Sequence, residues 1–421
     1  MSRSLLVRTV ALLSALALIA ALAAPAAAYP GDPGVASTTA PLPTPNTDAC
    51  PHRTGTPPAV DASEVVAPGE TTPTSLPVPT PPVGGERLGE CGVVHRPDAG
   101  PLPDRLNSAG WLIADMDSGR IIAAKDPHGR YRPASTIKVL LAIVALDELD
   151  LTDPVEATPN DWSMEGDSCG MGPGGKYTVR DLLSGLLVVS GNDCANALAR
   201  LLGGYDETLA KMNHKAAEIG ATDTRAASPS GLDAPGMSTS PYDLAAIFRT
   251  AMQNQTFREM IAMKTYTFPG YPKRTDVPGD EDHPAWTMGT SNSLLRDDWP
   301  GSLGGKTGYT DDALKTFVGA TERDGRTIVI VQMYGLNEAD NLYFAQAERM
   351  FEYGFAAPES VAVGSLEPTD RVDPETGEIH RAQTHSDDAS AWSVWTVSLL
   401  GFAAACLLVA AVLWRRRRRS R

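Results

Sequence analysis

Ser135 and Lys138 lie three residues apart at the start of the apolar segment "RPASTIKVLLAIVAL", residues 132–146. Residues with this spacing share one face of a helix, so the hydroxyl and the amine could touch if the helix begins near Ala134. A lysine can serve as the base that activates a serine when burial and a nearby cation lower its pKa. The pair also fits an ordinary helix start with an exposed lysine. Lys138, however, interrupts a row of large apolar residues, where a buried charge without a function would be costly.

Ser190 and Asn192 form a second candidate pair, in the stretch "VVSGNDCANAL" between two apolar helical patterns. Glycine and asparagine after an apolar run are ordinary helix-stop signals, so the segment also fits a simple helix end. The functional alternative is a hydroxyl that relays protons beside an amide that holds a substrate peptide bond. The residue types alone do not choose between these two interpretations.

Lys306, Thr307 and Gly308 form a third candidate, in the stretch "SLGGKTGYTDD", which strand-like sequence follows. A strand edge that carries a cation, a hydroxyl and a glycine without a side chain suits an extended peptide with a terminal carboxylate. The chain contains two other lysine-threonine pairs, at residues 264–265 and 315–316, and neither is followed by glycine. The glycine therefore distinguishes this segment from a chance pair.

The three candidates occur in the order serine-lysine, serine-glycine-asparagine and lysine-threonine-glycine. This order resembles the penicillin-recognising serine enzymes, whose motifs are S-x-x-K, S-D-N and K-T-G. The glycine of the second motif and the passages "SPSGLDAPGMSTSPYDLAAI", "TSNSLL" and "GGKTGYTDDALKTFVGATERDGR" resemble the D-alanyl-D-alanine carboxypeptidase branch. The resemblance covers residues 103–357. It implies an α+β fold of the β-lactamase/DD-peptidase type, with an antiparallel sheet from both chain ends and a helical subdomain.

The resemblance also implies a role for each candidate residue. Ser135 would attack the penultimate D-alanine of a peptidoglycan stem peptide that ends in D-Ala-D-Ala, and Lys138 would act as the general base. The backbone N–H groups of Ser135 and Tyr309 would form the oxyanion hole. The supporting residues would be Ser190 and Asn192 for catalysis and Lys306, Thr307, Gly308 and Tyr309 for substrate binding. β-Lactam antibiotics would acylate the same serine as covalent inhibitors, and we expect no cofactor and no metal.

The sequence departs from its relatives in two places. Class A β-lactamases carry a glutamate for rapid deacylation in a passage that is missing here after Asn192, so we expect slow turnover of penicillin. Cys194 lies two residues beyond Asn192, where the family does not require a cysteine. We hypothesise a disulfide between Cys169 and Cys194 that holds the loop of residues 162–175 over the site.

Five cysteines in an exported chain favour disulfides over metal or redox chemistry. Cys406 lies within residues 391–414, an uncharged segment long enough to cross a membrane, which leaves four cysteines outside it and three ways to pair them. Proximity in sequence suggests Cys50 with Cys91, in addition to Cys169 with Cys194. None of the spacings matches a typical zinc site.

The elements that must position these residues are strands at both ends of the unit and helices between them. Residues 110–125 and 316–333 each read as two apolar runs around a tight turn, which is typical of a hairpin. Residues 137–149 and 179–189 are apolar enough for buried helices, and residues 340–355 have a helical pattern. Thr178 followed by Asp181 predicts a capping box at the second helix.

The two termini predict export and a membrane anchor. Residues 1–28 read as a secretory signal peptide, and residues 391–414 carry no charge and are long enough to cross a bilayer as one helix. Six arginines within residues 415–421 favour a cytoplasmic tail, which places the catalytic unit outside the cell membrane as a single-pass protein. Residues 29–102 read as a mobile, Pro/Thr-rich extracytoplasmic linker and residues 358–390 as a polar stalk.

The net charge of −15 excludes nucleic-acid binding through phosphate contacts, all the more because eight arginines belong to the termini. The leading hypothesis is an exported serine-type D-Ala-D-Ala carboxypeptidase. Alternatives with the same covalent step are a β-lactamase and a DD-endopeptidase or transpeptidase. An alternative from another class is a membrane-anchored wall-binding protein without catalysis, against which the complete set of motif residues argues.

Overall fold

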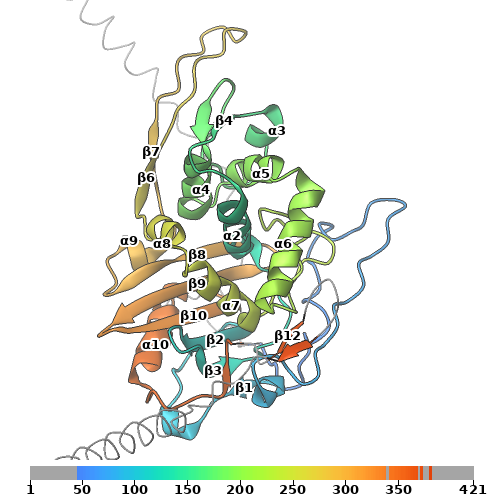
Figure 1. The fold of residues 1–421 in the computed structure, drawn as a ribbon, viewed down its shortest axis with the longest axis vertical. Coiled ribbons are helices and arrows are strands. Elements are labelled where there is room, and N and C mark those ends of the chain that lie inside the picture. Colours follow the sequence, from blue (N-terminus) through green and yellow to red (C-terminus); the bar gives the residue numbers. More distant parts are fainter. Residues whose placement is uncertain (1–44, 338–340, 368–369, 373–378, 382–421) are drawn as a thin grey trace, which may run out of the picture. The chain divides into compact units, whose positions relative to one another are not determined.

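An antiparallel sheet forms one layer of the fold, and both ends of the catalytic unit contribute strands to it (Figure 1). The computed structural model describes residues 45–337, 341–367, 370–372 and 379–381. The strand order is β1-β3-β2-β10-β9-β8, and β11 pairs with β3. The strands are β1 (Val93–Val94), β2 (Gly110–Asp115), β3 (Arg120–Lys125), β8 (Ser302–Thr310), β9 (Leu314–Arg323), β10 (Arg326–Gly335) and β11 (Gly364–Ser365).

The two predicted hairpins are β2–β3 and β9–β10, and they meet at the centre of the sheet where β10 pairs with β2. Asp115 closes the first turn, because its Oδ1 accepts hydrogen bonds from the backbone N–H and the hydroxyl of Ser118, at 2.9 and 2.6 Å. The strands from opposite ends of the unit thus build one sheet, which confirms the predicted α+β fold.

Side chains alternate between the two faces of the central strands, as the two-residue period of a strand requires. Leu112 and Val329 belong to the core on one face, together with helices α2 (Lys138–Glu148) and α7 (Pro241–Ala251). Ile113 and Ile330 belong to the core on the other face, together with α10 (Tyr343–Ala356). The sheet is therefore covered by helices on both faces.

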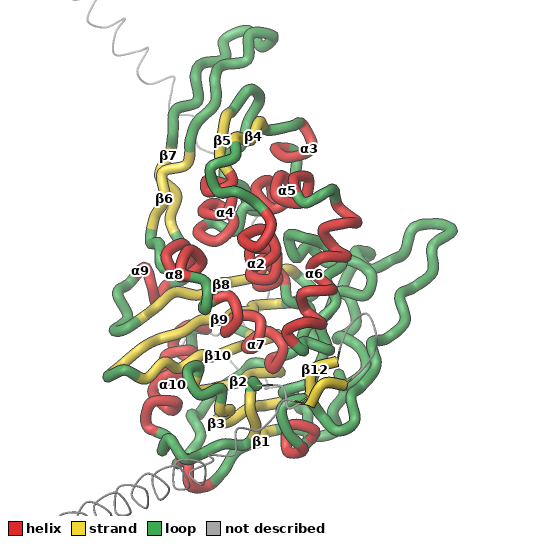
Figure 2. The backbone as a smooth tube through the Cα atoms, in the orientation of Figure 1, coloured by secondary structure: helices red, strands yellow, loops and turns green. Residues whose placement is uncertain are grey.

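The helical middle of the chain surrounds α2 (Figure 2). Residues of α2 from Lys138 to Ala145 are all buried, as expected for a helix that is apolar on every side. Thr178 and Asp181 form the predicted capping box at α4. The other helices here are α3 (Pro159–Trp162), α4 (Val179–Val188), α5 (Asn192–Leu201), α6 (Tyr205–Ile219), α8 (Gln255–Ile261) and α9 (Ser293–Arg296).

Three small antiparallel pairs lie outside the main sheet. They are β4 (Pro154–Glu156) with β5 (Lys176–Thr178), β6 (Thr265–Phe268) with β7 (Trp286–Gly289), and β12 (Asp370–Val372) with β13 (Ile379–Arg381). Short 3-10 helices are η1 (Glu86–Gly89), η2 (Pro97–Ala99) and η3 (Ala134–Ile137). The 3-10 helix η3 and the loop between α3 and β5 position residues of the site.

The described part of the predicted linker packs against the catalytic unit. We call residues 45–97 the N-terminal arm. The buried guanidinium of Arg130 donates hydrogen bonds to backbone carbonyls of the arm, those of Thr54, Leu76 and Pro77, at 3.3, 2.7 and 2.7 Å. The prediction of a mobile linker over residues 29–102 is therefore wrong for residues 45–102. Its composition gave no apolar periodicity, but backbone carbonyls of any sequence can satisfy a buried arginine.

The N-terminal arm is also closed on itself and joined to the sheet. A disulfide connects Cys50 with Cys91, one of the pairings that the sequence suggests. Val93 and Val94 then form β1 and pair with β3. The arm thus has anchors at several separate points of the catalytic unit.

The catalytic unit also extends past its predicted end at residue 357. Val363 and Leu366 are buried, and β11 pairs with β3, so the first residues of the predicted stalk 358–390 belong to the fold. No helix in the described part of the chain is both long and apolar enough to cross a membrane. The predicted signal peptide 1–28, membrane helix 391–414 and tail 415–421 lie outside the described residues.

Candidate active site

Ser135 lies in a tight turn at the start of the buried helix α2. Residues Ala134–Ile137 form the 3-10 turn η3, which leads directly into α2 at Lys138. Because such a turn has three residues per turn, side chains three apart stack above one another. Lys138 Nζ lies 2.7 Å from Ser135 Oγ. Ala134 has a φ of +47°, a left-handed conformation that non-glycine residues rarely adopt and that is found preferentially at functional turns.

Lys138 is fully buried, and its amine has two further partners. It lies 2.8 Å from Asn192 Oδ1 and 2.6 Å from the backbone oxygen of Ser230. A neutral amine can donate its two N–H groups to these two oxygens, which leaves its lone pair for the proton of the Ser135 hydroxyl. Burial, and after it the charge of Lys306, lowers the pKa of Lys138 well below its usual range. The environment therefore suits a general base.

Ser190 and Asn192 lie between α4 and α5 and border the same space as Ser135. Ser190 has a φ of +71°, and its buried hydroxyl has no hydrogen-bond partner among the described residues. Asn192 holds Lys138 through Oδ1, while its Nδ2 donates to the backbone oxygen of Glu165 at 2.6 Å. The segment is thus both a helix boundary and part of the site, with one hydroxyl free for proton transfer.

Lys306 is the second buried lysine of the site. It is 2 % exposed, and its Nζ donates to the backbone oxygen of Thr307 at 2.8 Å. Burial lowers the pKa of Lys306 to about 7, against the opposing influence of the Asp167 carboxylate. The hydroxyl of Thr307 lies 2.6 Å from that of Ser291. The site therefore has the hydroxyls of Ser291 and Thr307 at the surface of the cleft and the positive charge of the buried Lys306 behind them.

Gly308 lies where β8 comes closest to the nucleophile. A Cβ at this position would lie 2.8 Å from the backbone nitrogen of Ser135 and 3.0 Å from the Cβ of Ala134. A residue with a side chain would push the two segments apart, which explains the glycine. The next residue, Tyr309, is 57 % exposed at the mouth of the site. The backbone N–H groups of Ser135 and Tyr309 therefore lie on two segments in direct contact.

A cleft of about 370 Å³ joins the three motifs. Six of the eight residues singled out from the sequence line it: Ser135, Ser190, Asn192, Thr307, Gly308 and Tyr309. The other two, Lys138 and Lys306, are buried and act through their contacts with these residues. Ser135 and Tyr309, which are 309 − 135 = 174 positions apart in the sequence, thus meet at one opening.

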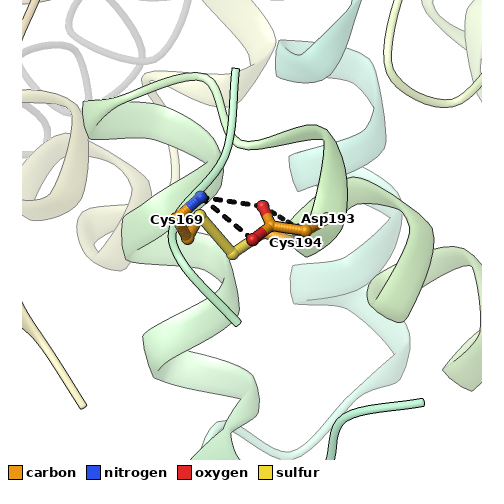
Figure 3. Close-up of side chains that lie close together, drawn as sticks. All are labelled: Cys169, Asp193 and Cys194. Carbon is orange, nitrogen blue, oxygen red and sulfur yellow. Dashed lines mark hydrogen bonds between the residues drawn. A yellow bond between two sulfur atoms is a disulfide. The ribbon is translucent and has the colours of Figure 1, made fainter. Parts of the chain in front are cut away.

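The loop of residues 163–175 is fastened to the site from two sides. The structure contains a disulfide between Cys169 and Cys194, and the carboxylate of Asp193 accepts hydrogen bonds from the backbone N–H of Cys169 (Figure 3). The N–H groups of Gly170 and Met171 donate to the same carboxylate at 3.1 Å. The part of the loop that lines the cleft, Gly166 and Asp167, is held by Asn192, whose backbone N–H donates to the backbone oxygen of Asp167 at 2.6 Å.

Gly191, the middle residue of the second motif, is explained by this disulfide. A Cβ at Gly191 would lie 2.1 Å from Cys169 Sγ and 3.0 Å from the Cys169 backbone nitrogen. A side chain there would displace the loop. The bridge and the glycine therefore belong to the same local arrangement.

Sequence reasoning missed four residues that the structure places in or beside the site. Ser230 contributes only its backbone oxygen, so its residue type carries no signal. Ser291 belongs to the passage "TSNSLL", whose resemblance implies no role for it, and none of the three motifs contains Asp167 or Asp193. The acidic residue directly after the second motif, at the start of a helix, is the one signal that could have indicated Asp193.

A serine activated by a buried lysine, with a free hydroxyl and a second cation beside it, defines a serine hydrolase that works through an acyl-enzyme without histidine. Residues 98–336 match the D-alanyl-D-alanine carboxypeptidase family, peptidase family S11. The chain belongs to this family of serine peptidases.

Individual relatives agree with the family. D-alanyl-D-alanine carboxypeptidase DacB2 of Mycobacterium tuberculosis is 48% identical over 269 residues, which cover 63% of this chain and 88% of the relative. A crystal structure of a D-alanyl-D-alanine carboxypeptidase from that organism matches with a TM-score of 0.58 and 47% identity, over 63% of this chain and 97% of the other. A Streptomyces DD-transpeptidase structure matches with a TM-score of 0.55 and 27% identity, over 61% and 100%.

The pKa of Lys306 predicts loss of activity in alkaline solution. Lys306 must be protonated to attract a carboxylate, and with a pKa of about 7 it loses its charge as the pH rises through that value. The kcat/KM for a peptide with a free carboxyl terminus should therefore fall above about pH 7, because kcat/KM reports the free enzyme. The guanidinium of the Lys306→Arg variant does not titrate in this range. Its kcat/KM should be lower than that of the wild type but should stay constant to higher pH. A fall in kcat/KM at the same alkaline pH in both proteins would contradict this assignment.

Proposed function

We propose that this protein removes the terminal D-alanine from peptidoglycan stem peptides that end in D-Ala-D-Ala, through an acyl-enzyme on Ser135. The observation that carries the proposal is the 2.7 Å contact between Lys138 Nζ and Ser135 Oγ beside a cleft that Thr307 and Gly308 also line. The family and the name of the 48% identical relative support the same activity.

Substrate binding follows from the position of β8 at the edge of the sheet. An extended peptide can pair with such an edge as an additional strand. Its terminal carboxylate would then meet the hydroxyl of Thr307 and the charge of Lys306. The scissile carbonyl would lie at Ser135, with its oxygen between the N–H groups of Ser135 and Tyr309, where negative charge develops in the transition state.

The chemical steps use the groups that surround Ser135. Its Oγ attacks the carbonyl of the penultimate D-alanine as its proton passes to Lys138 Nζ, and a tetrahedral intermediate forms. The bond to the terminal D-alanine breaks, and the leaving amine takes a proton from Lys138 through the free hydroxyl of Ser190. A water molecule then attacks the ester, which releases the shortened peptide and restores Ser135.

The outcome with β-lactams follows from the residues beside the ester. Among the described residues that line the cleft there is no glutamate to activate a deacylating water. Glu218, a glutamate that follows Asn192 in the sequence, does not line the cleft and pairs with Lys215 and His214 on the surface of α6. The penicilloyl ester should therefore persist, which makes penicillin an inhibitor.

We expect release of D-alanine from a D-Ala-D-Ala peptide to exceed hydrolysis of the chromogenic β-lactam nitrocefin by at least about a hundred-fold in kcat. Both rates are measured on the same preparation, with Ser135→Ala as the blank. Rapid nitrocefin hydrolysis with little D-alanine release would favour the β-lactamase alternative. Absence of both activities and of penicillin binding would favour a wall-binding protein without catalysis.

We also propose that residues 391–414 anchor the chain in the cell membrane, with the catalytic unit outside and residues 415–421 in the cytoplasm. The support is the uncharged length of the segment and the arginines that follow it. The full chain expressed in a bacterial host should sediment with membranes and resist carbonate extraction, while a chain that stops at residue 390 should be released. Equal release of both would overturn the proposal.

A further inference from the structure

Residues 57–64 of the N-terminal arm contact two buried residues, Arg132 and Asp312, that lie just behind segments lining the active site. On one side, Glu64 Oε1 and the backbone oxygen of Pro57 accept hydrogen bonds from the guanidinium of Arg132, at 2.6 and 2.8 Å. On the other side, the backbone N–H of Val60 and the hydroxyl of Ser63 donate to the carboxylate of Asp312, at 2.5 and 3.0 Å. The segment therefore links Arg132 to Asp312.

Both of these residues adjoin groups that the reaction needs. Arg132 precedes Ser135 by three residues, and Asp312 follows Tyr309 by three residues. The N–H groups of Ser135 and Tyr309 are the two donors of the oxyanion hole, and they belong to different chain segments. Their separation decides how well they bind the developing negative charge. A link between Arg132 and Asp312 acts on that separation.

Arg132 and Asp312 depend on the arm because both are buried. Each side chain is 1% exposed, and Arg132 Nε lies 4.0 Å from Asp312 Oδ2, beyond hydrogen-bond distance. The Glu64 carboxylate is the partner in direct contact with Arg132, and two donors of the arm satisfy Asp312. Buried charges must be paired, so removal of the Glu64 carboxylate leaves Arg132 without its partner in direct contact and favours a shift toward the remaining carboxylates of Asp312 and Asp233.

We propose that Glu64 is a positioning residue for the reaction: through Arg132 it holds the nucleophile turn against the end of β8 and so fixes the oxyanion hole. The inference rests on the proposed function. Residues 57–64 lie outside the residues 98–336 that match the family, so none of the three sequence motifs includes this support.

The rest of the arm keeps its place when Glu64 is replaced. The disulfide of Cys50 with Cys91 closes the arm, the carbonyls of Leu76 and Pro77 bind Arg130, and β1 pairs with β3. None of these contacts involves Glu64. A substitution there therefore tests the link to Arg132 and not the attachment of the whole arm.

The test compares Glu64→Ala, Glu64→Gln and the control Glu70→Gln with the wild type. Glu70 is exposed on the same arm, and its side chain makes no hydrogen bond or ion pair among the described residues. The readouts are the rate of acylation by a fluorescent penicillin, kcat and KM for D-alanine release, and the melting temperature of each variant.

We expect Glu64→Ala to slow acylation and lower kcat about ten-fold, with KM within about two-fold, since misplacement of reacting groups affects the transition state. Glu64→Gln should lie in between, because its amide oxygen can still accept from Arg132. Glu70→Gln should match the wild type.

Three outcomes would overturn the inference. A lower melting temperature with an unchanged acylation rate would show a purely structural role, and a raised KM with unchanged kcat would show a substrate contact. If Glu64→Ala fails to fold, wild-type kinetics of the Glu64→Gln variant would overturn the inference. Absence of acylation in the wild type would instead overturn the proposed function, so the two failures are distinguishable.

Discussion

The variant Lys138→Arg is expected to be acylated by penicillin about a thousand-fold more slowly than the wild type. Arginine keeps the positive charge, but the guanidinium does not deprotonate and so cannot take the proton of Ser135. In the structure, burial and the charge of Lys306 lower the pKa of Lys138, which makes a neutral amine available at its position. Arginine also cannot fit the site that the carbonyls of Asn192 and Ser230 form around a single nitrogen.

Rapid-mixing measurements with a fluorescent penicillin give this rate. Lys273→Arg is the matched control, because Lys273 is exposed on the long loop between β6 and β7 and should acylate normally. The melting temperature of each protein separates loss of the base from loss of the fold. Unchanged acylation of a folded Lys138→Arg variant would remove Lys138 from its assigned role.

The variant Ser135→Ala is expected to lose D-alanine release almost completely, by roughly a million-fold, and to form no covalent adduct with penicillin. Removing the nucleophile abolishes the acyl-enzyme, while the cleft and the two buried lysines, Lys138 and Lys306, remain. The fold should persist, since the Ser135 hydroxyl has its hydrogen bond with Lys138 alone among the described residues. Loss of activity should therefore occur without a large change in melting temperature.

D-alanine release and penicillin labelling are measured together on this variant, with Ser360→Ala as the matched surface control. Ser360 is exposed after α10 and far from the three motifs in sequence. Labelling of Ser135→Ala at the wild-type level would mean that another residue is the nucleophile. Labelling of the control should equal that of the wild type.

Local patterns predicted much of the fold. The hairpins β2–β3 and β9–β10 arise from apolar runs around tight turns, and the Thr178 capping box opens α4 where the sequence places it. Such signals involve residues a few positions apart, which is the range that local physical chemistry controls. The pairing of β10 with β2, by contrast, joins residues more than two hundred positions apart, and no local pattern specifies it.

Three functional features depend on the tertiary structure more than on residue types. Ser230 acts through a backbone oxygen, which every residue possesses. Asp193 binds backbone N–H groups of a loop whose path is set by the tertiary fold. The N-terminal arm has the composition of a linker, but its hydrogen bonds with the buried Arg130 and Arg132 and the pairing of β1 with β3 show that it belongs to the catalytic unit.

The motif residues themselves were found because function constrains both their types and their order. Lys138 stood out as a charge in an apolar row, and Gly308 as the glycine that the other lysine-threonine pairs lack. The structure gives the physical reason for each: Lys138 has partners for its amine, and Gly308 allows β8 to approach the nitrogen of Ser135. The motif residues could be predicted from the sequence, whereas the distances between them follow from the fold.

The role of Ser135 as the nucleophile is tested most directly by the mass of the wild-type protein after reaction with benzylpenicillin, followed by peptide mapping of the adduct. One penicilloyl group per chain is expected, on the hydroxyl of Ser135 in the peptide that contains "RPASTIK". An adduct on any other residue, or no adduct on a folded protein, would contradict this role.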